Sequence, residues 1–112
     1  IYEQQIQGGI AQGIGYALME DLKVSEGRIK TEDLSTYKIP TALDVPKMFS
    51  IPVEIDEQTG PFGLKGVGEI SINGPLPAIA NAIYDACGVR ISRAPFTAER
   101  IFSELCKKKQ EV

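Results

Sequence analysis

Apolar residues recur at spacings of three and four along the first part of the chain. Over residues 2–22 they line one helical face: Ile6, Ile10, Ile14, Ala17, Leu18 and Leu22. This period predicts an amphipathic helix over 2–22. Glycines at 8, 9, 13 and 15 interrupt it, and each costs about 1 kcal/mol relative to alanine in a helix interior. Gly9 and Gly13 lie one turn apart and predict a bare stripe where another backbone or a ligand approaches closely.

Over residues 24–55 the apolar residues no longer follow a helical spacing. The stretch 24–29 predicts a hairpin-like turn with Gly27 at positive φ, and Thr31 is placed to cap a short turn through residue 34. Residues 37–46 contain two prolines and predict an extended loop. Residues 48–55 alternate and predict a strand, which Pro52 restricts to an edge. Its apolar face consists of Phe49, Ile51, Val53 and Ile55.

Two further helices are predicted towards the C-terminus. Gly74-Pro75 starts one of them and Gly88 ends it. Its apolar face consists of Leu76, Ile79, Ala80, Ile83 and Cys87. Residues 89–91 predict a brief strand. Thr97 is placed to cap a last helix that has Glu99 in its first turn and Lys107 to Lys109 near its end.

These elements predict an α+β fold. Two or three helices would pack on a small mixed or antiparallel sheet that contains the 49–55 strand. The length of 112 residues is that of one domain, 1–112.

Composition narrows the classes of partner. The net charge of −3 gives no electrostatic reason to expect nucleic acid or an anionic membrane. There is no histidine, and Cys87 and Cys106 form no C-x-x-C pair, so no metal site is expected within the chain. No apolar run approaches a membrane span of ~18 residues, and no signal peptide is visible. We expect a cytoplasmic protein with thiols in a reducing compartment.

The glycine-rich stretch 8–15 does not satisfy the dinucleotide-binding pattern, because its glycines lie inside a helical period and no strand precedes them. No Gly-Lys-Ser/Thr follows, so a phosphate loop is disfavoured as well. Two interpretations remain. The glycines permit close helix packing, or the amide of Gln12, beside Gly13, contacts the edge of a heterocycle.

A second glycine-rich stretch ends on an acid. Gly66 and Gly68 precede Glu69, so the backbone there can press against a bulky group and direct the carboxylate at it. The alternative is a surface turn with a solvated glutamate. General acid–base chemistry needs a reacting group within hydrogen-bond reach, and the chain offers no histidine or metal cluster to provide one. If Glu69 is catalytic, the oxidant comes from outside this chain.

The order and spacing of several stretches resemble the C-terminal part of the molybdopterin-binding large subunit of the xanthine dehydrogenase/aldehyde oxidase family. They are GGIAQGIGYALMEDL (8–22), STYKIPTALDVP (35–46), GPFGLKGVGE (60–69), PAIANAIYDACGVRI (77–91) and TAERI (97–101). The resemblance implies that the chain is part of a larger molybdopterin-binding domain.

The resemblance also implies roles for particular residues. Glu69 would be the general base at the molybdenum centre, in a hydroxylation of an N-heterocycle or an aldehyde whose oxygen comes from water. Gln12 would approach the pterin and Gly13 would let the helix come close to it. Gly66, Val67 and Gly68 would line the same cavity.

The chain departs from the family in two respects. The family commonly has two prolines after the glutamate, whereas this chain has Ile70-Ser71, so the loop is expected to be looser or the substrate different. The family's large subunit is also several-fold longer. We therefore expect an excised domain, a proteolytic piece or a split-gene product that is inactive alone.

The expected partners are the remainder of the large subunit, which shares the molybdenum–molybdopterin cofactor, and iron–sulfur and flavin (FAD) subunits. Exposed apolar surface would make the isolated chain a possible homo-oligomer. Two rival hypotheses remain: a non-catalytic remnant or interaction module that retains the fold, and a nucleotide-binding domain.

Overall fold

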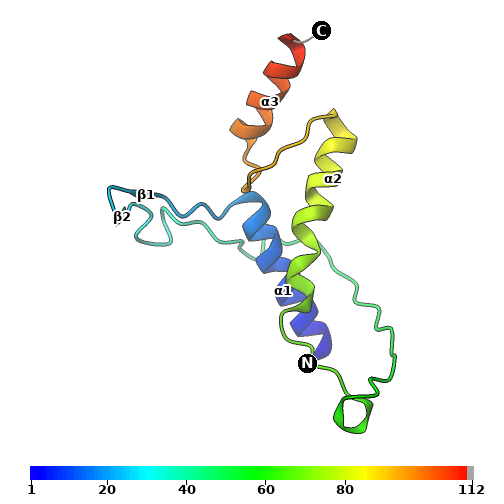
Figure 1. The fold of residues 1–112 in the computed structure, drawn as a ribbon. Coiled ribbons are helices and arrows are strands. Elements are labelled where there is room, and N and C mark those ends of the chain that lie inside the picture. The colour runs from blue at the N-terminus through cyan, green and yellow to red at the C-terminus, as the bar shows by residue number, and fades with distance from the viewer. Residues whose placement is uncertain (111–112) are drawn as a thin grey trace.

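The computed structural model describes residues 1–110 as three helices joined by long loops and one short hairpin (Figure 1). The α-helices are α1 (Tyr2–Leu18), α2 (Pro75–Cys87) and α3 (Ala98–Gln110). The hairpin consists of β1 (Val24–Ser25) and β2 (Arg28–Ile29), and two 3-10 turns are η1 (Pro61–Gly63) and η2 (Ile70–Asn73). The predicted domain 1–112 includes residues 111–112, which lie outside the described residues.

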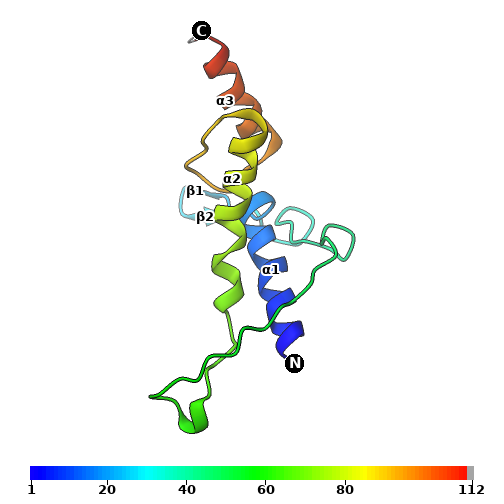
Figure 2. The same cartoon turned by 90° about the vertical axis from the view of Figure 1, so that its right-hand side faces the viewer.

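Helices α1 and α2 lie side by side and run in the same direction (Figures 1 and 2), with η2 packed against α1 just before α2 begins. The predicted bare stripe forms this contact. A side chain added at Gly9 would overlap the hydroxyl of Ser71, and one at Gly13 would place its Cβ 2.7 Å from Pro75 Cγ. The glycines of α1 therefore permit a helix approach that larger residues would prevent.

Helix α1 ends at Leu18, four residues before the predicted boundary of 22. The backbone N–H groups of Met19 and Glu20 both donate to Gly15 O, at 2.9 Å, and this shared acceptor closes the last turn. The apolar period continues to Leu22, but the chain has already left the helix, and Leu22 is exposed.

The predicted start and end of α2 are confirmed. Pro75 occupies the first helical position and Gly88 ends the helix at φ 67°, a left-handed conformation that glycine adopts without strain. The predicted apolar face is half-buried throughout. The brief strand predicted at 89–91 is wrong, since those residues form a loop in which Val89 is buried.

Helix α3 begins after Thr97, whose hydroxyl accepts the Arg100 N–H at 3.4 Å, so the predicted cap is confirmed. No residue of α3 is buried, and the helix extends away from the other two (Figure 1). Two contacts hold the start of α3 near the end of α1. Phe96 N, just before α3, donates to Ala17 O of α1 at 2.6 Å, and Arg100 of α3 forms an ion pair of 3.3 Å with Asp21, in the segment after α1.

The hairpin over 24–29 is confirmed, with Val24 paired to Ile29 and Gly27 at φ 72°. The capping role predicted for Thr31 is wrong, because its hydroxyl accepts the Lys23 N–H across the hairpin at 3.2 Å. The following turn is built on Asp33 instead. Its carboxylate accepts the hydroxyls of Ser35 and Thr36 at 2.6 and 3.1 Å and their backbone N–H groups at 3.0 and 3.1 Å. These bonds, the two from the hydroxyls first, lower the pKa of Asp33.

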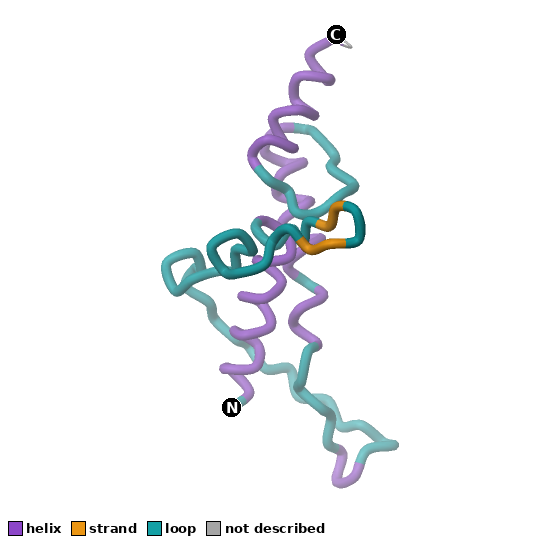
Figure 3. Tube along the Cα trace, turned by 90° about the vertical axis from the view of Figure 1, so that its left-hand side faces the viewer, coloured by secondary structure: helices purple, strands orange, loops and turns teal. Residues whose placement is uncertain are grey.

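The predicted 48–55 strand is wrong: these residues form a loop, although the α+β class is confirmed by three helices and an antiparallel pair of strands. A strand needs a neighbour for its ladder, and this segment has none in the described part of the chain (Figure 3). The helices consequently do not pack on a sheet containing 49–55. The alternating side chains are exposed: Phe49 by 78%, Ile51 by 81%, Val53 by 77% and Ile55 by 65%.

The described residues form an open arrangement with a small core. Only four apolar residues in the described part are buried: Ile14, Ala17, Val89 and Phe96. The radius of gyration is 17.8 Å, against about 13 Å for a compact domain of this length. The accessible surface is 8867 Å², whereas a compact monomer of 12.2 kDa would expose about 6,100 Å².

No helix of the described residues is long and apolar enough to cross a membrane.

Candidate functional site

The loop that carries Glu69 projects beyond the N-terminal end of α1 (Figure 2). Its tip, residues 57–64, is a self-contained turn in which Glu57 N donates to Gly63 O at 3.1 Å. Phe62, at the tip, is 98% exposed and adopts a positive φ of 56°. The chain then returns without helix or strand to Glu69, which is exposed and immediately precedes η2.

The space that a side chain would occupy is empty at both Gly66 and Gly68. A Cβ added at either position would meet no atom of the described residues within 4 Å. The φ angle is not positive at either residue; the glycines with positive φ are Gly27, Gly63 and Gly88. Neither packing within the described residues nor backbone strain therefore accounts for glycine at these two positions. This is the observation expected if a group outside the chain occupies the space beside the loop.

The Glu69 loop is joined to α1. The amide Nε2 of Gln5 donates to Val67 O at 3.4 Å, and the Ser71 hydroxyl donates to the backbone carbonyl of Gln5 at 3.3 Å. Val67 is half-buried, in contrast to its two glycine neighbours. Sequence reasoning missed Gln5, since a glutamine on an exposed helix surface gives no signal of such a contact.

Gln12 lies two helical turns after Gln5 on the same side of α1, because seven residues complete almost two turns. Its side chain is exposed, and its Nε2 donates to Tyr16 Oη at 3.0 Å. It lines a hollow of about 310 Å³ with Ala11, Glu20, Ile39 and Pro40. Glu69 does not line that hollow, so the chain alone does not bring Gln12 and Glu69 into one cavity.

Gly13 is buried against Pro75 and Ile72. Helix packing within the chain is therefore sufficient to account for glycine at this position. The role towards a cofactor that the resemblance implies for Gly13 stays a prediction.

The hollow beside Gln12 is braced by a hydrogen bond that sequence reasoning did not anticipate. Tyr37 Oη donates to Glu20 Oε2 at 2.5 Å. This bond to the Glu20 carboxylate, with burial, raises the pKa of Tyr37 to about 12. It fastens the loop around residues 37–40 to the C-terminal end of α1, where Gly15 leaves room for Glu20 and Pro40.

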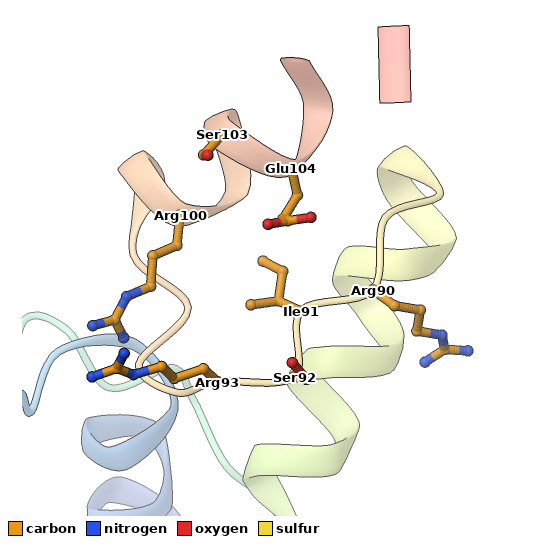
Figure 4. Close-up of a pocket in the computed structure, with 7 residues that line it drawn as sticks. All are labelled: Arg90, Ile91, Ser92, Arg93, Arg100, Ser103 and Glu104. Atoms are coloured by element: carbon orange, nitrogen blue, oxygen red, sulfur yellow. The ribbon is translucent and has the colours of Figure 1, made fainter. Parts of the chain in front are cut away.

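A separate hollow of about 260 Å³ lies between α3 and the loop after α2 (Figure 4). Three arginines line it, but two are already engaged: Arg100 with Asp21 and with Pro95 O at 2.7 Å, and Arg90 with the ring of Tyr84, whose centroid lies 3.9 Å away. Figure 4 shows Glu104 directed into the hollow while Arg90 points away from it. This arrangement does not form an anion site, and Glu69 lies elsewhere.

The described residues contain no group of three or more potential metal-ligating side chains. Cys87 and Cys106 are both free thiols and half-buried. Cys87 Sγ donates to Ile83 O within α2 at 3.0 Å.

Comparison with known proteins defines the class first. Residues 1–46, which include Gln12 and Gly13, match the molybdopterin cofactor-binding domain family. A probable hypoxanthine oxidase of Escherichia coli (strain K12) is 41% identical over 105 residues, covering 92% of this chain and 11% of that protein.

Solved structures agree with this class. The quinoline 2-oxidoreductase of Pseudomonas putida 86 superposes with a TM-score of 0.85 at 37% identity, over 94% of this chain and 14% of that one. The aldehyde oxidoreductase of Desulfovibrio gigas gives 0.83 at 40% identity, over 94% of this chain and 11% of that one. The chain belongs to the xanthine dehydrogenase/aldehyde oxidoreductase family of molybdenum-binding subunits. It spans 11–14% of the length of these relatives.

Proposed function

We propose that this chain supplies the general base Glu69 and part of the pterin pocket of a molybdenum hydroxylase. The observation that carries the proposal is the open space beside Gly66 and Gly68, directly before an exposed carboxylate. A loop without side chains at these positions leaves room for a large planar group and a substrate beside the acid.

The residues fit a pterin cofactor. Gln12 presents an amide with two N–H donors and one acceptor, and its bond to Tyr16 uses one donor, so the amide can also pair with a heterocycle edge. Gly66, Val67 and Gly68 offer a backbone that such a group can approach closely, and Gly13 lets α1 lie close to the same region. Together these residues would form one wall of the pterin pocket, and the remaining contacts would come from the rest of the subunit.

A molybdenum cofactor bound there would serve as Lewis acid and as acceptor of two electrons. Glu69 would remove a proton from the oxygen nucleophile derived from water, and a carboxylate oxygen of Glu69 would hold that proton while the oxygen attacks an electron-poor carbon. The proposal that this carbon belongs to an N-heterocycle or an aldehyde group is supported by relatives named for hypoxanthine, quinoline and aldehydes.

The test is Glu69→Gln in the complete, cofactor-loaded enzyme. Removing the base should lower kcat by about 10²–10⁴-fold, while the molybdenum content stays at the wild-type level. Glu32→Gln, which alters another exposed glutamate, is the matched control and should retain full activity. Full activity of Glu69→Gln would refute the catalytic role and favour the rival hypothesis of a non-catalytic remnant or interaction module.

The same proposal makes activity a property of the assembly. The remainder of the subunit, and iron–sulfur and flavin (FAD) subunits that carry electrons away, would be required, and the chain alone would turn over no substrate. Hydroxylase activity of the purified 112-residue chain would contradict this part of the proposal.

A further inference from the structure

One residue of α1, Gln5, contacts the chain on both sides of Glu69. Its amide holds the carbonyl of Val67 at 3.4 Å, and its backbone carbonyl accepts the hydroxyl of Ser71 at 3.3 Å. Val67 lies two residues before the glutamate and Ser71 lies two residues after it. The two hydrogen bonds therefore bracket the carboxylate from a single point on a helix of 17 residues.

The Ser71 side of this bracket is reinforced by packing. Ser71 sits against Gly9, where an added Cβ would overlap its hydroxyl and lie 3.3 Å from Ile72 N. The turn also closes on itself, because Ile72 N donates to Glu69 O at 3.2 Å. Ser71 is thus held by contacts with α1.

On the Val67 side, the glutamine amide makes the one hydrogen bond to the 66–68 segment within the described residues. At Gly66 and Gly68 no atom of the described residues lies within 4 Å of an added Cβ, so the space beside these two residues is not filled by packing. Glycine also has the largest range of backbone conformations, so an unanchored 66–68 segment would sample many orientations. A single bond longer than the usual 2.9–3.0 Å is weak, but here it acts on a residue that has glycine on both sides.

We propose that Gln5 is a positioning residue for Glu69. Its amide and its backbone carbonyl, the latter through Ser71, hold the loop so that the carboxylate meets its proton donor in a fixed orientation. The inference rests on the proposed role of Glu69 as general base. Misplacement of a catalytic group by about 1 Å can cost up to about 100-fold in rate, so even weak anchors matter here.

The kinetic test uses the complete enzyme with Gln5→Leu and Ser71→Ala. The matched control is Gln4→Leu, at an equally exposed neighbour in the same helical turn. We expect kcat to fall about tenfold in each of the first two variants with KM nearly unchanged, and no change in the control. In a Glu69→Gln background, Gln5→Leu should cause no further loss, because there is no base left to position. An equal further loss in that background, or Gln5→Leu behaving like Gln4→Leu, would overturn the inference.

Hydrogen exchange provides a readout that does not depend on catalysis. In the cofactor-free complete subunit, amides of residues 64–72 should exchange about fivefold faster in Gln5→Leu and in Ser71→Ala, but not in Gln4→Leu. Unchanged exchange in both variants would refute the anchor even if Glu69 is the base. Faster exchange together with full activity of Glu69→Gln would instead show that the anchor exists and the proposed base does not.

Discussion

Two pairs of closely spaced glycines in this chain differ completely in their surroundings. Gly9 and Gly13 lie in a packed junction, where added methyl groups would collide with Ser71 and Pro75. Gly66 and Gly68 lie in a loop, where added methyl groups would meet nothing within 4 Å. The first pair is explained by the chain itself. The second pair has no such explanation within the described residues, and we assign the space beside it to a group outside the chain.

The difference separates the structural from the functional use of glycine. Where the protein's own atoms occupy the space beside a glycine, the glycine supports packing. Its replacement should then change the free energy of unfolding. Openness alone does not mark a functional glycine, because Gly8 on the surface of α1 is open as well. Gly66 and Gly68 differ from Gly8 in lying directly before Glu69, so we expect their replacement to change activity rather than stability. Two glycine substitutions test this distinction directly. Two further substitutions, at Ile51 and Tyr37, test a surface that lacks neighbours and a contact made within the chain.

The largest effect is expected for Gly68→Val in the complete enzyme. The branched side chain would occupy the space beside Glu69 that we assign to cofactor and substrate, so kcat/KM should fall by about 100-fold. The hydrogen-exchange protection of α1 and α2 should stay as in the wild type, because the loop position touches neither helix. Gly8→Val, at another open glycine on α1, is the control and should keep its activity. Normal turnover of Gly68→Val would remove the functional reading of the open pair.

The next effect extends the comparison to residues 48–55, whose apolar side chains also lack neighbours in the chain. We expect the rest of the subunit to cover them, so Ile51→Asp should destabilise the complete subunit by about 2–3 kcal/mol, the value of burying such a side chain. Urea unfolding of the subunit measures this. Glu54→Gln, at a position of opposite parity in the alternating segment, should be neutral. Equal midpoints for Ile51→Asp and the wild type would mean that the segment stays exposed.

A smaller effect is expected for Gly13→Ala. Its Cβ would lie 2.7 Å from Pro75 Cγ, and overpacking of this kind costs about 1–3 kcal/mol, partly offset by the roughly 1 kcal/mol that alanine gains in a helix. We therefore expect a net destabilisation of about 1 kcal/mol in urea unfolding, with kcat unchanged in the folded enzyme. Gly8→Ala should instead stabilise α1. A lower kcat with unaltered stability would give Gly13 the cofactor role that the resemblance implies.

The smallest effect concerns Tyr37. Its pKa is raised to about 12 by the bond to Glu20, so the folded state holds this proton more tightly than the unfolded state, whose pKa is near 10.0. The contribution to stability is complete below pH 10 and is lost as the pH rises towards 12. Urea midpoints of the chain should fall more steeply over this range than those of Tyr37→Phe. Parallel curves would show that the bond does not form in solution.

The sequence predicted well those elements whose signals are local. Pro75 and Gly88 bound α2, Thr97 caps α3 and Gly27 turns the hairpin, because each acts through its own backbone geometry or a neighbour a few residues away. The acidic loop was also located, together with the bare residues beside it.

The sequence failed where an outcome depends on distant partners. The alternation over 48–55 is a correct strand pattern, but no ladder can form without a second strand. Thr31 bonds across the hairpin to Lys23 instead of capping a turn, and Gln5 meets Val67 across 62 positions of sequence. In each case, tertiary proximity decided between options that were locally equivalent.

The accessible surface of this region has a consequence for its survival in a cell. A region with four buried apolar residues has little free energy of its own to resist local opening, so its folded population depends on the polypeptide that covers it. Copies that fail to acquire that covering would open frequently and become substrates for proteases.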